Sequence, residues 1–296
     1  MLLKGIILAG GSGTRLNPLT KVISKQLLPV YDKPMIYYPL SVLMQAGIRE
    51  ILIISTPEDT PKFMKLFGDG SDFGLKLDYK IQPKPEGLAQ AFILGESFLD
   101  KESACMILGD NIFYDKDLSK KLKSSVNKKS GATIFAYKVD NPKRFGVIEF
   151  DEKKKVISIE EKPENPKSNY CVTGLYFYDN KVVDYAKGLK PSKRGELEIT
   201  DLNNIYLHNN ELSVEVLSDT SKWMDAGTIE SLFETSEFVR QQEKINKNKM
   251  GCLEEIAYKN GWISLEKLKE NISKMGLSEY RIYLENLLMG EHKKWK

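Results

Sequence analysis

The sequence predicts an α/β fold, with a Rossmann-like, mostly parallel central sheet flanked by helices and a small helical appendage at the C-terminal end. Short apolar runs rich in β-branched residues alternate with amphipathic stretches of helical spacing as far as residue 110. Parallel strands joined by right-handed helical crossovers produce this alternation. Beyond residue 250 only helical patterns remain, which indicates the appendage.

The first apolar run, residues 5–9, opens the predicted sheet. It is too short for a buried helix and contains two isoleucines, so we expect a strand covered on both faces. Helix and strand patterns then alternate along the chain. In order, they predict a helix over 34–47, a strand over 50–55, a helix over 61–67, a strand over 75–82, a helix over 87–98 and a strand over 104–110.

The second half of the chain continues the sheet with strongly β-prone runs. Gly174 lies in the middle of one of them, which is consistent with a ligand lying against that strand. A helix is expected to begin near Gly195, and Thr200 and Asp201 are able to cap it. The other expected elements are strands over 132–139, 169–178 and 212–217, a hairpin of 144–150 with 156–163, and helices over 179–189 and 229–244.

A lysine- and asparagine-rich stretch, residues 244–250, is typical of a linker. We therefore predict an α/β domain over 1–243 and a helical appendage over 244–296. Three short helices cannot bury all their apolar residues among themselves, so the surplus is expected to pack on the core domain or on another subunit. These helices are expected over 253–259, 265–275 and 279–289.

Composition narrows the class of protein. The 296 residues are 41% hydrophobic, which is enough for one large domain with an appendage. Basic and acidic residues number 44 and 41 and are interspersed, so no nucleic-acid partner is expected. Three cysteines without C-x-x-C spacing argue against a disulfide framework or a thiolate metal site. Without a long apolar run or a signal-peptide pattern, we expect a cytoplasmic protein with no membrane partner.

The turn after the first strand has the composition of a phosphate-binding loop. Its glycines can adopt positive φ and expose a row of N–H groups, and Thr14 and Arg15 add a hydroxyl and a guanidinium group. A dinucleotide fingerprint would need glycine where Leu16 stands, and no P-loop string follows. Glycines alone often form a plain tight turn, but Arg15 and the later Lys25 favour phosphate binding. The loop consists of Gly10, Gly11, Ser12, Gly13, Thr14 and Arg15.

Three polar residues follow predicted strands, where ligands of such sheets bind. Gln82 precedes a proline-stiffened loop that ends at Gly87, and its amide could pair with a nucleobase edge; it could also be an ordinary surface residue. Asp110 follows a buried strand, and Asp225 ends a second short string before a helix. A single aspartate at such a place is often a turn or cap residue, but two of them could complete one Mg2+ site.

An acidic and a basic residue lie together at the end of the predicted hairpin. Glu161 could bind sugar hydroxyls and Lys162 the phosphate of a sugar, or the two could form a cross-strand ion pair of little energetic weight. Gly146, in the partner strand of the hairpin, marks a place of close backbone approach.

Taken together, these strings resemble the signature of the sugar-phosphate nucleotidylyltransferases, and in particular of the members that transfer thymidylate to glucose 1-phosphate. The similarity runs from residue 2 to about residue 290. Phe145, Met224 and Ala226 stand where Tyr, Leu and Thr are common, and none of these changes removes a charge. The strings are Gly-Gly-Ser-Gly-Thr-Arg-Leu, Ser-Lys-Gln-Leu-Leu-Pro-Val, Gly-Asp-Asn, Arg-Phe-Gly-Val-Ile-Glu-Phe, Glu-Glu-Lys-Pro and Trp-Met-Asp-Ala-Gly-Thr.

The resemblance implies that dTTP and glucose 1-phosphate react to dTDP-glucose and pyrophosphate, the first step toward dTDP-linked deoxysugars such as rhamnose. It assigns Arg15 and Lys25 to the triphosphate and the transition state, Asp110 and Asp225 to Mg2+, and Lys162 to the sugar phosphate. The nucleotide half would contribute Leu8, Gly10, Gly11, Ser12, Gly13, Thr14, Gln26, Gln82 and Gly87, and the second half Asn111, Gly146, Glu161, Val172 and Tyr176.

Two other functions remain open at this stage. An enzyme of the same chemistry could use UTP, or the chain could be a nucleotide-sugar sensor that has lost turnover. A sensor would be expected to lack Arg15, Lys25 or one of the two aspartates, and this chain has all four. The resemblance also implies a homotetramer, with inhibition by a downstream product at a second site near a subunit interface.

Overall fold

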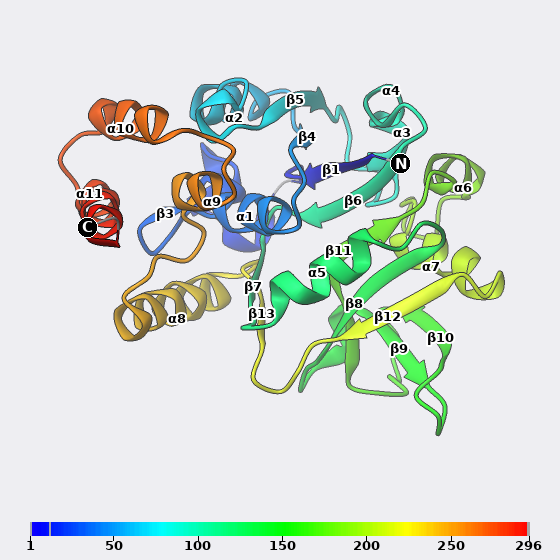
Figure 1. The fold of residues 1–296 in the computed structure, drawn as a ribbon. Helices are drawn as coiled ribbons and strands as arrows, with labels where there is room; N and C mark the ends of the chain where they lie inside the picture. Colours follow the sequence, from blue (N-terminus) through cyan, green and yellow to red (C-terminus); the bar gives the residue numbers. More distant parts are fainter. Residues whose placement is uncertain (1, 12, 295–296) are drawn as a thin grey trace.

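The computed structural model describes residues 2–11 and 13–294, with side chains as far as residue 290. Ser12, which was assigned to the phosphate loop, lies outside the described residues. Within these residues, nine strands form one central sheet whose main path has the order β10-β9-β11-β6-β1-β4-β5 (Figure 1). β8 pairs with β11, and β12 pairs with β8. Helices cover this sheet, so the predicted α/β class is confirmed.

The first half of the sheet is parallel, as predicted. β1 pairs in parallel with both β4 and β6, and β4 pairs in parallel with β5. The carboxyl ends of these strands therefore lie at one edge, where the predicted phosphate loop and Asp110 follow β1 and β6. The strands span Leu3–Leu8 (β1), Glu50–Ser55 (β4), Lys76–Ile81 (β5) and Ser103–Leu108 (β6).

Beyond β6 the sheet is mixed. β11 runs antiparallel to β6, β8 and β9, and β9 forms the predicted hairpin with β10, whereas β12 is parallel to β8. Antiparallel neighbours need only short connections, which suits the closely spaced strand patterns of this half. The strands span Ala132–Lys138 (β8), Gly146–Phe150 (β9), Val156–Glu161 (β10), Tyr170–Tyr178 (β11) and Leu212–Val216 (β12).

Helices bury both faces of the sheet, because alternate residues of the parallel strands point into two different hydrophobic clusters. Ile7 and Ile107 lie in one cluster, and Ile6 and Met106 in the other. The first cluster includes α1 (Tyr37–Gln45), α2 (Thr60–Phe67), α5 (Leu118–Val126), α9 (Leu253–Lys259), α10 (Leu265–Lys274) and α11 (Glu279–Lys294). The second includes α3 (Gln90–Leu94), α4 (Glu96–Leu99), α6 (Val182–Gly188) and α7 (Ile199–His208).

The C-terminal helices pack on the first half of the chain. Leu253, Leu268 and Leu284 are buried in the same cluster as the apolar residues of α1 and α2. A Cβ at Gly74 would lie 2.6 Å from the backbone oxygen of Trp262, so only glycine permits this approach. Part of the apolar surface of the tail is thus buried on the core domain, one of the two expected outcomes. The division at residue 244 stays a prediction; it falls inside α8 (Ile229–Asn246).

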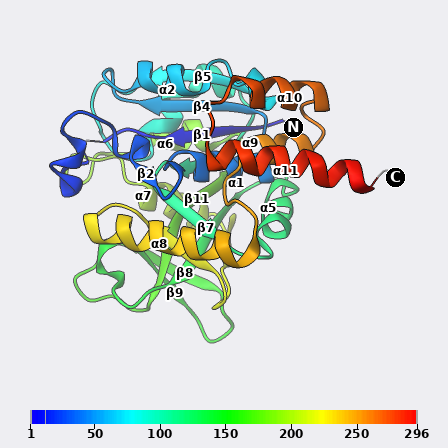
Figure 2. The ribbon, with the colours of Figure 1, turned by 90° about the vertical axis from the view of Figure 1, so that its left-hand side faces the viewer.

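The two views show how the remaining elements are arranged. In the view of Figure 2, α8 runs across the molecule between β1 and β9, and α11 packs beside α9, where the hydroxyls of Tyr280 and Tyr283 donate to Glu254 and Glu255. None of the helices in the described part of the chain combines the length and the apolar character needed to cross a membrane. The cysteines Cys105, Cys171 and Cys252 are free and buried.

Several local predictions need correction. The helix expected over 87–98 is divided into α3 and α4 at Gly95, and the helix near Gly195 begins only at Ile199, with Glu198 as its N-cap. Thr200 and Asp201 are therefore inside the first turn of α7 and do not cap it. The elements that were not predicted include α5 and the strands Asn111–Tyr114 (β7) and Lys222–Asp225 (β13), which form a separate antiparallel pair. A further short pair is Pro29–Val30 (β2) with Lys33–Pro34 (β3).

Candidate active site

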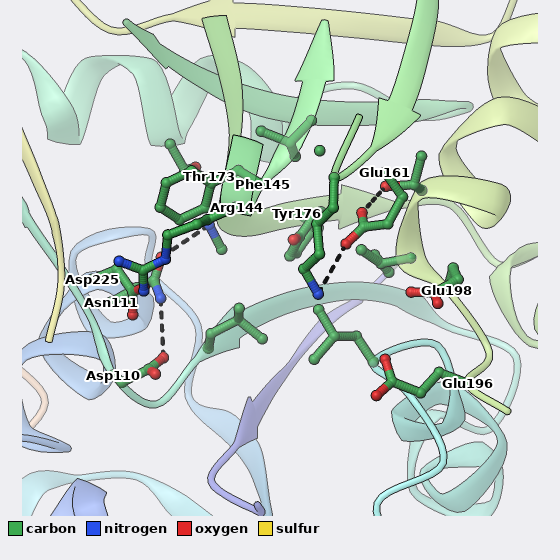
Figure 3. A pocket seen from close by; sticks show the side chains of 18 of the residues that line it. Asp110, Asn111, Arg144, Phe145, Glu161, Thr173, Tyr176, Glu196, Glu198 and Asp225 are labelled. Atoms are coloured by element: carbon green, nitrogen blue, oxygen red, sulfur yellow. Dashed lines mark hydrogen bonds and ion pairs between the residues drawn. The ribbon is translucent and has the colours of Figure 1, made fainter. Parts of the chain in front are cut away.

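A cavity of about 500 Å3 lies between the carboxyl ends of the parallel strands and the second half of the sheet (Figure 3). It brings together residues that are far apart in the sequence and come from both halves of the chain. The predicted residues that line it are Arg15, Asp110, Asn111, Gly146, Glu161, Lys162, Val172, Tyr176 and Asp225. All the residues predicted for the sugar phosphate and both predicted metal ligands therefore share one cavity.

Asp110 is held in a tight turn between β6 and β7. A Cβ at the preceding Gly109 would lie 2.9 Å from the side chain of Gln26, so glycine is needed where the turn passes the first loop. The Lys25 ammonium donates to Asp110 Oδ2, and Asn111 Nδ2 donates to Asp110 Oδ1 at 3.0 Å. Burial would raise the pKa of Asp110, but the Lys25 charge and these hydrogen bonds hold it below its usual value. Asp110 is therefore a carboxylate at neutral pH.

Asp225 reaches the same place from the other end of the chain. It lies opposite Asn111 in the β13–β7 pair, and the N–H of the following Ala226 donates to the backbone oxygen of Asp110 at 3.2 Å. Burial and the Asp110 carboxylate raise the pKa of Asp225, although nearby cations oppose them. One of these cations is Arg144, whose Nη2 lies 3.8 Å from Asp225 Oδ2.

Arg15 approaches this pair of carboxylates from the glycine-rich loop. A Cβ at Gly227 would lie 2.8 Å from Arg15 Nη2 and 2.9 Å from Asp225 Oδ1, so the absence of a side chain at Gly227 lets the guanidinium group reach the carboxylate region. Two aspartates beside Arg15 and Lys25 form a site that combines hard oxygen ligands with cations. Such a site can hold a divalent ion together with an anionic phosphate chain.

The two carboxylates suit Mg2+ that is bound jointly with substrate. Among the described residues, no group of three or more His, Cys, Asp or Glu side chains could hold a metal by itself. Mg2+ in phosphate-transferring enzymes commonly takes one or two carboxylates and completes its six ligands with water and substrate phosphates. The mutual repulsion that raises the pKa of Asp225 is what a bound cation would relieve. Asp110 and Asp225 therefore fit the ion.

The wall formed by the second half is polar. Thr200 Oγ1 donates to Glu161 Oε2 at 2.6 Å, and Lys162 Nζ lies 3.4 Å from Glu161 Oε1 (Figure 3). Glu161 and Lys162 thus form an ion pair that lines the cavity, but between neighbours in the chain and not across strands as the alternative proposed. Arg194 Nη2 lies 3.6 Å from Glu161 Oε1 and also binds the carboxylate of Glu198. This side of the cavity therefore offers both carboxylates and cations to a ligand.

Two hydrogen bonds to its Oδ1 atom fix the orientation of the Asn111 side chain. Trp223 Nε1 donates to Asn111 Oδ1 at 2.6 Å, and the N–H of Gly174 donates to the same oxygen at 3.0 Å. Gly174, the glycine predicted to meet a ligand, lines the cavity, and a Cβ there would lie 2.6 Å from that oxygen. The amide nitrogen is thereby directed at Asp110.

Most residues assigned to the nucleotide surround the cavity without lining it. Gln26 and Gln82 are buried, and a Cβ at Gly10 would lie 2.2 Å from Gln82 Oε1, which places this amide against the loop. Gly11 and Lys25 line a neighbouring hollow of about 320 Å3. The other predicted residues outside the large cavity are Leu8 at the end of β1, Gly13 and Thr14 at the start of a 3-10 turn, and Gly87, which packs on Leu197.

Sequence reasoning missed several residues of the cavity. Arg144 and Arg194 lie in loops and look like surface charges in the sequence, and only the folded chain brings them to the carboxylates. Trp223 was quoted only as part of a string, because its hydrogen bond to Asn111 depends on the unpredicted pairing of β13 with β7. Thr200 was assigned to a helix cap instead of to Glu161.

Comparison with known proteins agrees with this geometry. Residues 4–242 match the model of a family described as nucleotidyl transferase. The glucose-1-phosphate thymidylyltransferase of Neisseria meningitidis is 58% identical over 286 residues, which cover 97% of this chain and 99% of that protein. The protein of the same name from Mycobacterium tuberculosis is 51% identical over the same shares of the two chains.

Solved structures show the same fold. A Bacillus anthracis structure, provisionally described as a glucose-1-phosphate thymidylyltransferase in complex with sucrose, has a TM-score of 0.75 and 47% identity and covers 80% of this chain and 95% of its own. A UDP-glucose pyrophosphorylase complexed with UDP-glucose has a TM-score of 0.70 at 24% identity over 82% of this chain and 100% of its own, and it supports the fold alone. The family resemblance stated above is thus confirmed, and the chain belongs to the nucleotidyl transferase family, among relatives that are named glucose-1-phosphate thymidylyltransferase.

Proposed function

We propose that this protein transfers thymidylate from dTTP to glucose 1-phosphate, with dTDP-glucose and pyrophosphate as products. The observation that carries the proposal is the meeting of Asp110 and Asp225 with Arg15 and Lys25 at one end of a cavity whose other end holds Lys162 and Glu161. This arrangement has separate places for a triphosphate and for a sugar phosphate. A nucleotide-sugar sensor would not need the first group of charges, which makes this alternative less suited to the site.

The chemistry requires charge neutralisation and alignment more than proton transfer. A phosphate oxygen of the sugar attacks the α-phosphorus of dTTP in line with the leaving pyrophosphate, and this oxygen is already ionised at neutral pH. Lys162 holds the attacking phosphate, while Arg15 and Lys25 neutralise the triphosphate as charge develops. Each such contact is worth roughly 3 kcal/mol in a preorganised site. Asp110 and Asp225 would hold Mg2+, which when bound supplies positive charge to the phosphate oxygens.

The cavity and the residues around it would also select the substrates. Glu161, fixed by Thr200, accepts hydrogen bonds from sugar hydroxyls, and Asn111 and Tyr176 border the same space. Gln82 reads the base through an amide that pairs with the O4 and N3–H edge of thymine. Uracil shares that edge, so the protein is expected to reject CTP strongly and UTP only weakly, since the thymine methyl adds about 1 kcal/mol.

A pyrophosphate-release assay tests the proposal. The protein is incubated with Mg2+, glucose 1-phosphate and one of dTTP, UTP, CTP, ATP or GTP, and each reaction is repeated without the sugar phosphate as a control. Release that requires glucose 1-phosphate and is fastest with dTTP supports the proposal. Fastest release with UTP would favour the uridylyltransferase, and no release with any nucleotide would favour the sensor.

We further propose that the protein is a homotetramer inhibited by a dTDP-linked deoxysugar downstream in the same route. Large apolar side chains stay exposed near the C-terminal helices of the single chain, with Leu277 85% and Met289 61% exposed, and association of subunits would cover them. A hollow of about 290 Å3 outside the catalytic cavity is lined by Tyr114, whose ring could stack on a base, and by Lys249 and Lys259. Lys249 is paired with Glu243 and Lys259 with Glu255, so a diphosphate would compete with these carboxylates for the ammonium groups. We propose this hollow as the inhibitory site.

A further inference from the structure

Two buried glutamines in the nucleotide half form a hydrogen-bonded pair. Gln82 directly follows β5, and Gln90 opens α3. Gln82 Nε2 donates to Gln90 Oε1 at 2.7 Å, and the two residues are only 4% and 8% exposed. Buried amides must satisfy their donors and acceptors within the protein, so the direction of this hydrogen bond is a property of the fold.

Glu86 determines which end of the Gln90 amide faces Gln82. The backbone N–H of Glu86 donates to Gln90 Oε1 at 3.2 Å, and Gln90 Nε2 donates to Glu86 Oε2 at 2.7 Å. A peptide N–H can only donate and a carboxylate can only accept. In a reversed Gln90 amide, the nitrogen would face the Glu86 N–H and the oxygen would face the Glu86 carboxylate, and neither contact would be a hydrogen bond. Gln90 therefore directs its side-chain oxygen at Gln82. Only the nitrogen of the Gln82 amide can donate a hydrogen bond to that oxygen.

The segment that carries Glu86 is held independently of Gln90. The N–H of Leu197 donates to the backbone oxygen of Glu86 at 2.7 Å, and the N–H of Ala89 donates to the oxygen of Leu197 at 3.2 Å. Gly87 has a φ of +104°, and a Cβ there would lie 2.4 Å from the Leu197 oxygen, so only glycine allows this contact. A change of the Gln90 side chain therefore leaves the backbone of this loop in place.

The oxygen of the Gln82 amide faces the first loop. A Cβ at Gly10 would lie 2.2 Å from Gln82 Oε1, so this oxygen is directed at the backbone of the glycine-rich turn. With one N–H given to Gln90, the amide offers its oxygen and its second N–H in a fixed order. Thymine and uracil present an N–H beside a carbonyl oxygen, whereas cytosine presents an acceptor nitrogen beside an amino group. For a base held in one position, Gln82 can pair with the cytosine pattern instead of the thymine pattern only if its amide turns over, so that the oxygen and the nitrogen change places.

We propose that Gln90 is a positioning residue that fixes the orientation of the Gln82 amide and thereby makes it discriminate against cytosine nucleotides. The inference rests on the proposed function, in which Gln82 reads the base. Without Gln90 the Gln82 amide is free to turn over, and it then accepts the cytosine edge as well as the thymine edge.

The experiment measures kcat/KM for dTTP, UTP and CTP with glucose 1-phosphate in the wild type and in three variants. Gln90→Met removes the acceptor at similar length and is expected to lower the dTTP-to-CTP ratio about tenfold, which corresponds to the loss of one oriented hydrogen bond. The dTTP-to-UTP ratio should stay unchanged, because these bases share the edge. Gln90→Glu keeps an oxygen that accepts from Gln82 but removes the N–H that donates to Glu86 Oε2, so it is combined with Glu86→Gln, whose amide can donate to the new carboxylate. This double variant should retain most of the wild-type dTTP-to-CTP ratio. Gln82→Met is the reference variant, because it shows the dTTP-to-CTP ratio when the Gln82 amide is absent.

The outcomes separate the two claims. An equal loss of kcat/KM with all three nucleotides in Gln90→Met would show a purely structural role and overturn the inference. If Gln82→Met relaxes the ratio and Gln90→Met does not, Gln82 reads the base without help from Gln90, and only the inference fails. If Gln82→Met retains discrimination against CTP, the base is read elsewhere and both claims fail.

Discussion

Asp225 lies opposite Asn111 in the antiparallel pair of β13 and β7, and this register places it beside Asp110. The contact is made by two short strands that stand apart from the central sheet. It joins the carboxyl end of β6, in the parallel half of the sheet, to the segment that leads into α8. A pair of carboxylates built in this way depends on the relative placement of both halves of the chain, so the site exists only when both are folded.

Replacing either aspartate is expected to abolish most turnover. Asp110→Asn and Asp225→Asn each remove a hard oxygen ligand, and kcat should fall about 100-fold or more at saturating Mg2+. Their effects on stability should differ. Asp110→Asn leaves the Lys25 ammonium without its carboxylate and should lower the melting temperature, whereas Asp225→Asn removes a repelling charge and should not. Near-normal rates in either variant would contradict the shared metal site.

Trp223→Phe is expected to weaken use of the sugar phosphate. The change keeps an aromatic ring but removes the indole N–H that donates to Asn111 Oδ1. The Asn111 amide then has only the Gly174 N–H to orient it, and kcat/KM for glucose 1-phosphate should fall about tenfold. The same change in an Asn111→Ala background should have little further effect. An additive loss in the double variant would show that Trp223 acts by another route.

How far the sequence predicted this molecule depended on the range of the interactions. Runs such as 5–9 and 50–55 form strands because their own β-branched residues favour them and both faces become buried. β13, in contrast, contains Lys222 and Met224 in a string with no clear period, and it is a strand because it pairs with distant β7. α5 was missed because it is lysine-rich and buries only one side.

The same distinction between local and long-range interactions separates the site residues that the sequence predicted from those that it did not. Arg15, Lys25 and Asp110 were recognisable because each lies in or near a loop whose local sequence already indicates phosphate or metal chemistry. Arg194 and Thr200 were not, because their role depends on Glu161 at the end of β10, a strand against which α7 packs. Charged loop residues become part of a site through tertiary contacts that a single sequence does not reveal.

Glu254→Gln is expected to stabilise the protein at neutral pH. Burial raises the pKa of Glu254, although the hydroxyl of Tyr280, which donates to its carboxylate at 2.5 Å, opposes this. Because the folded pKa lies above the unfolded one, the folded state binds more protons between them, and stability falls as pH rises through that interval. The variant should melt about 2 °C higher at pH 8 and lose this advantage near pH 4.

Glu255→Gln is the matched control for that measurement. Glu255 is also buried, but Lys259 Nζ lies 2.6 Å from its Oε1 and the Tyr283 hydroxyl donates to Oε2. Loss of its charge removes an ion pair, so this variant should melt lower at neutral pH. A Glu254→Gln protein that melts lower than the wild type at pH 8 would show that the buried carboxylate is stabilising.

The last prediction concerns the C-terminal helices and assembly. Deleting residues 251–296 would remove Leu253 and Leu268 from the cluster that buries α1 and α2, so the truncated chain should lose stability whether or not it assembles. Substitutions at exposed positions separate the effect on stability from the effect on assembly. Leu277 and Ile282 are 85% and 44% exposed, and changing both to lysine leaves the core intact while placing charge on the proposed interface.

The double variant, Leu277→Lys with Ile282→Lys, should give a smaller particle in light scattering and a weaker response to a dTDP-linked deoxysugar such as dTDP-rhamnose. Its turnover without inhibitor should persist, because both changes lie outside the catalytic cavity. Met64→Lys, an equally polar change at a half-exposed position on α2, controls for surface charge alone. Inhibition at a separate site requires that the inhibitor favour one of two arrangements of the protein, and an interface next to α11 can carry that preference. A double variant that remains tetrameric and fully inhibitable would remove these helices from both roles.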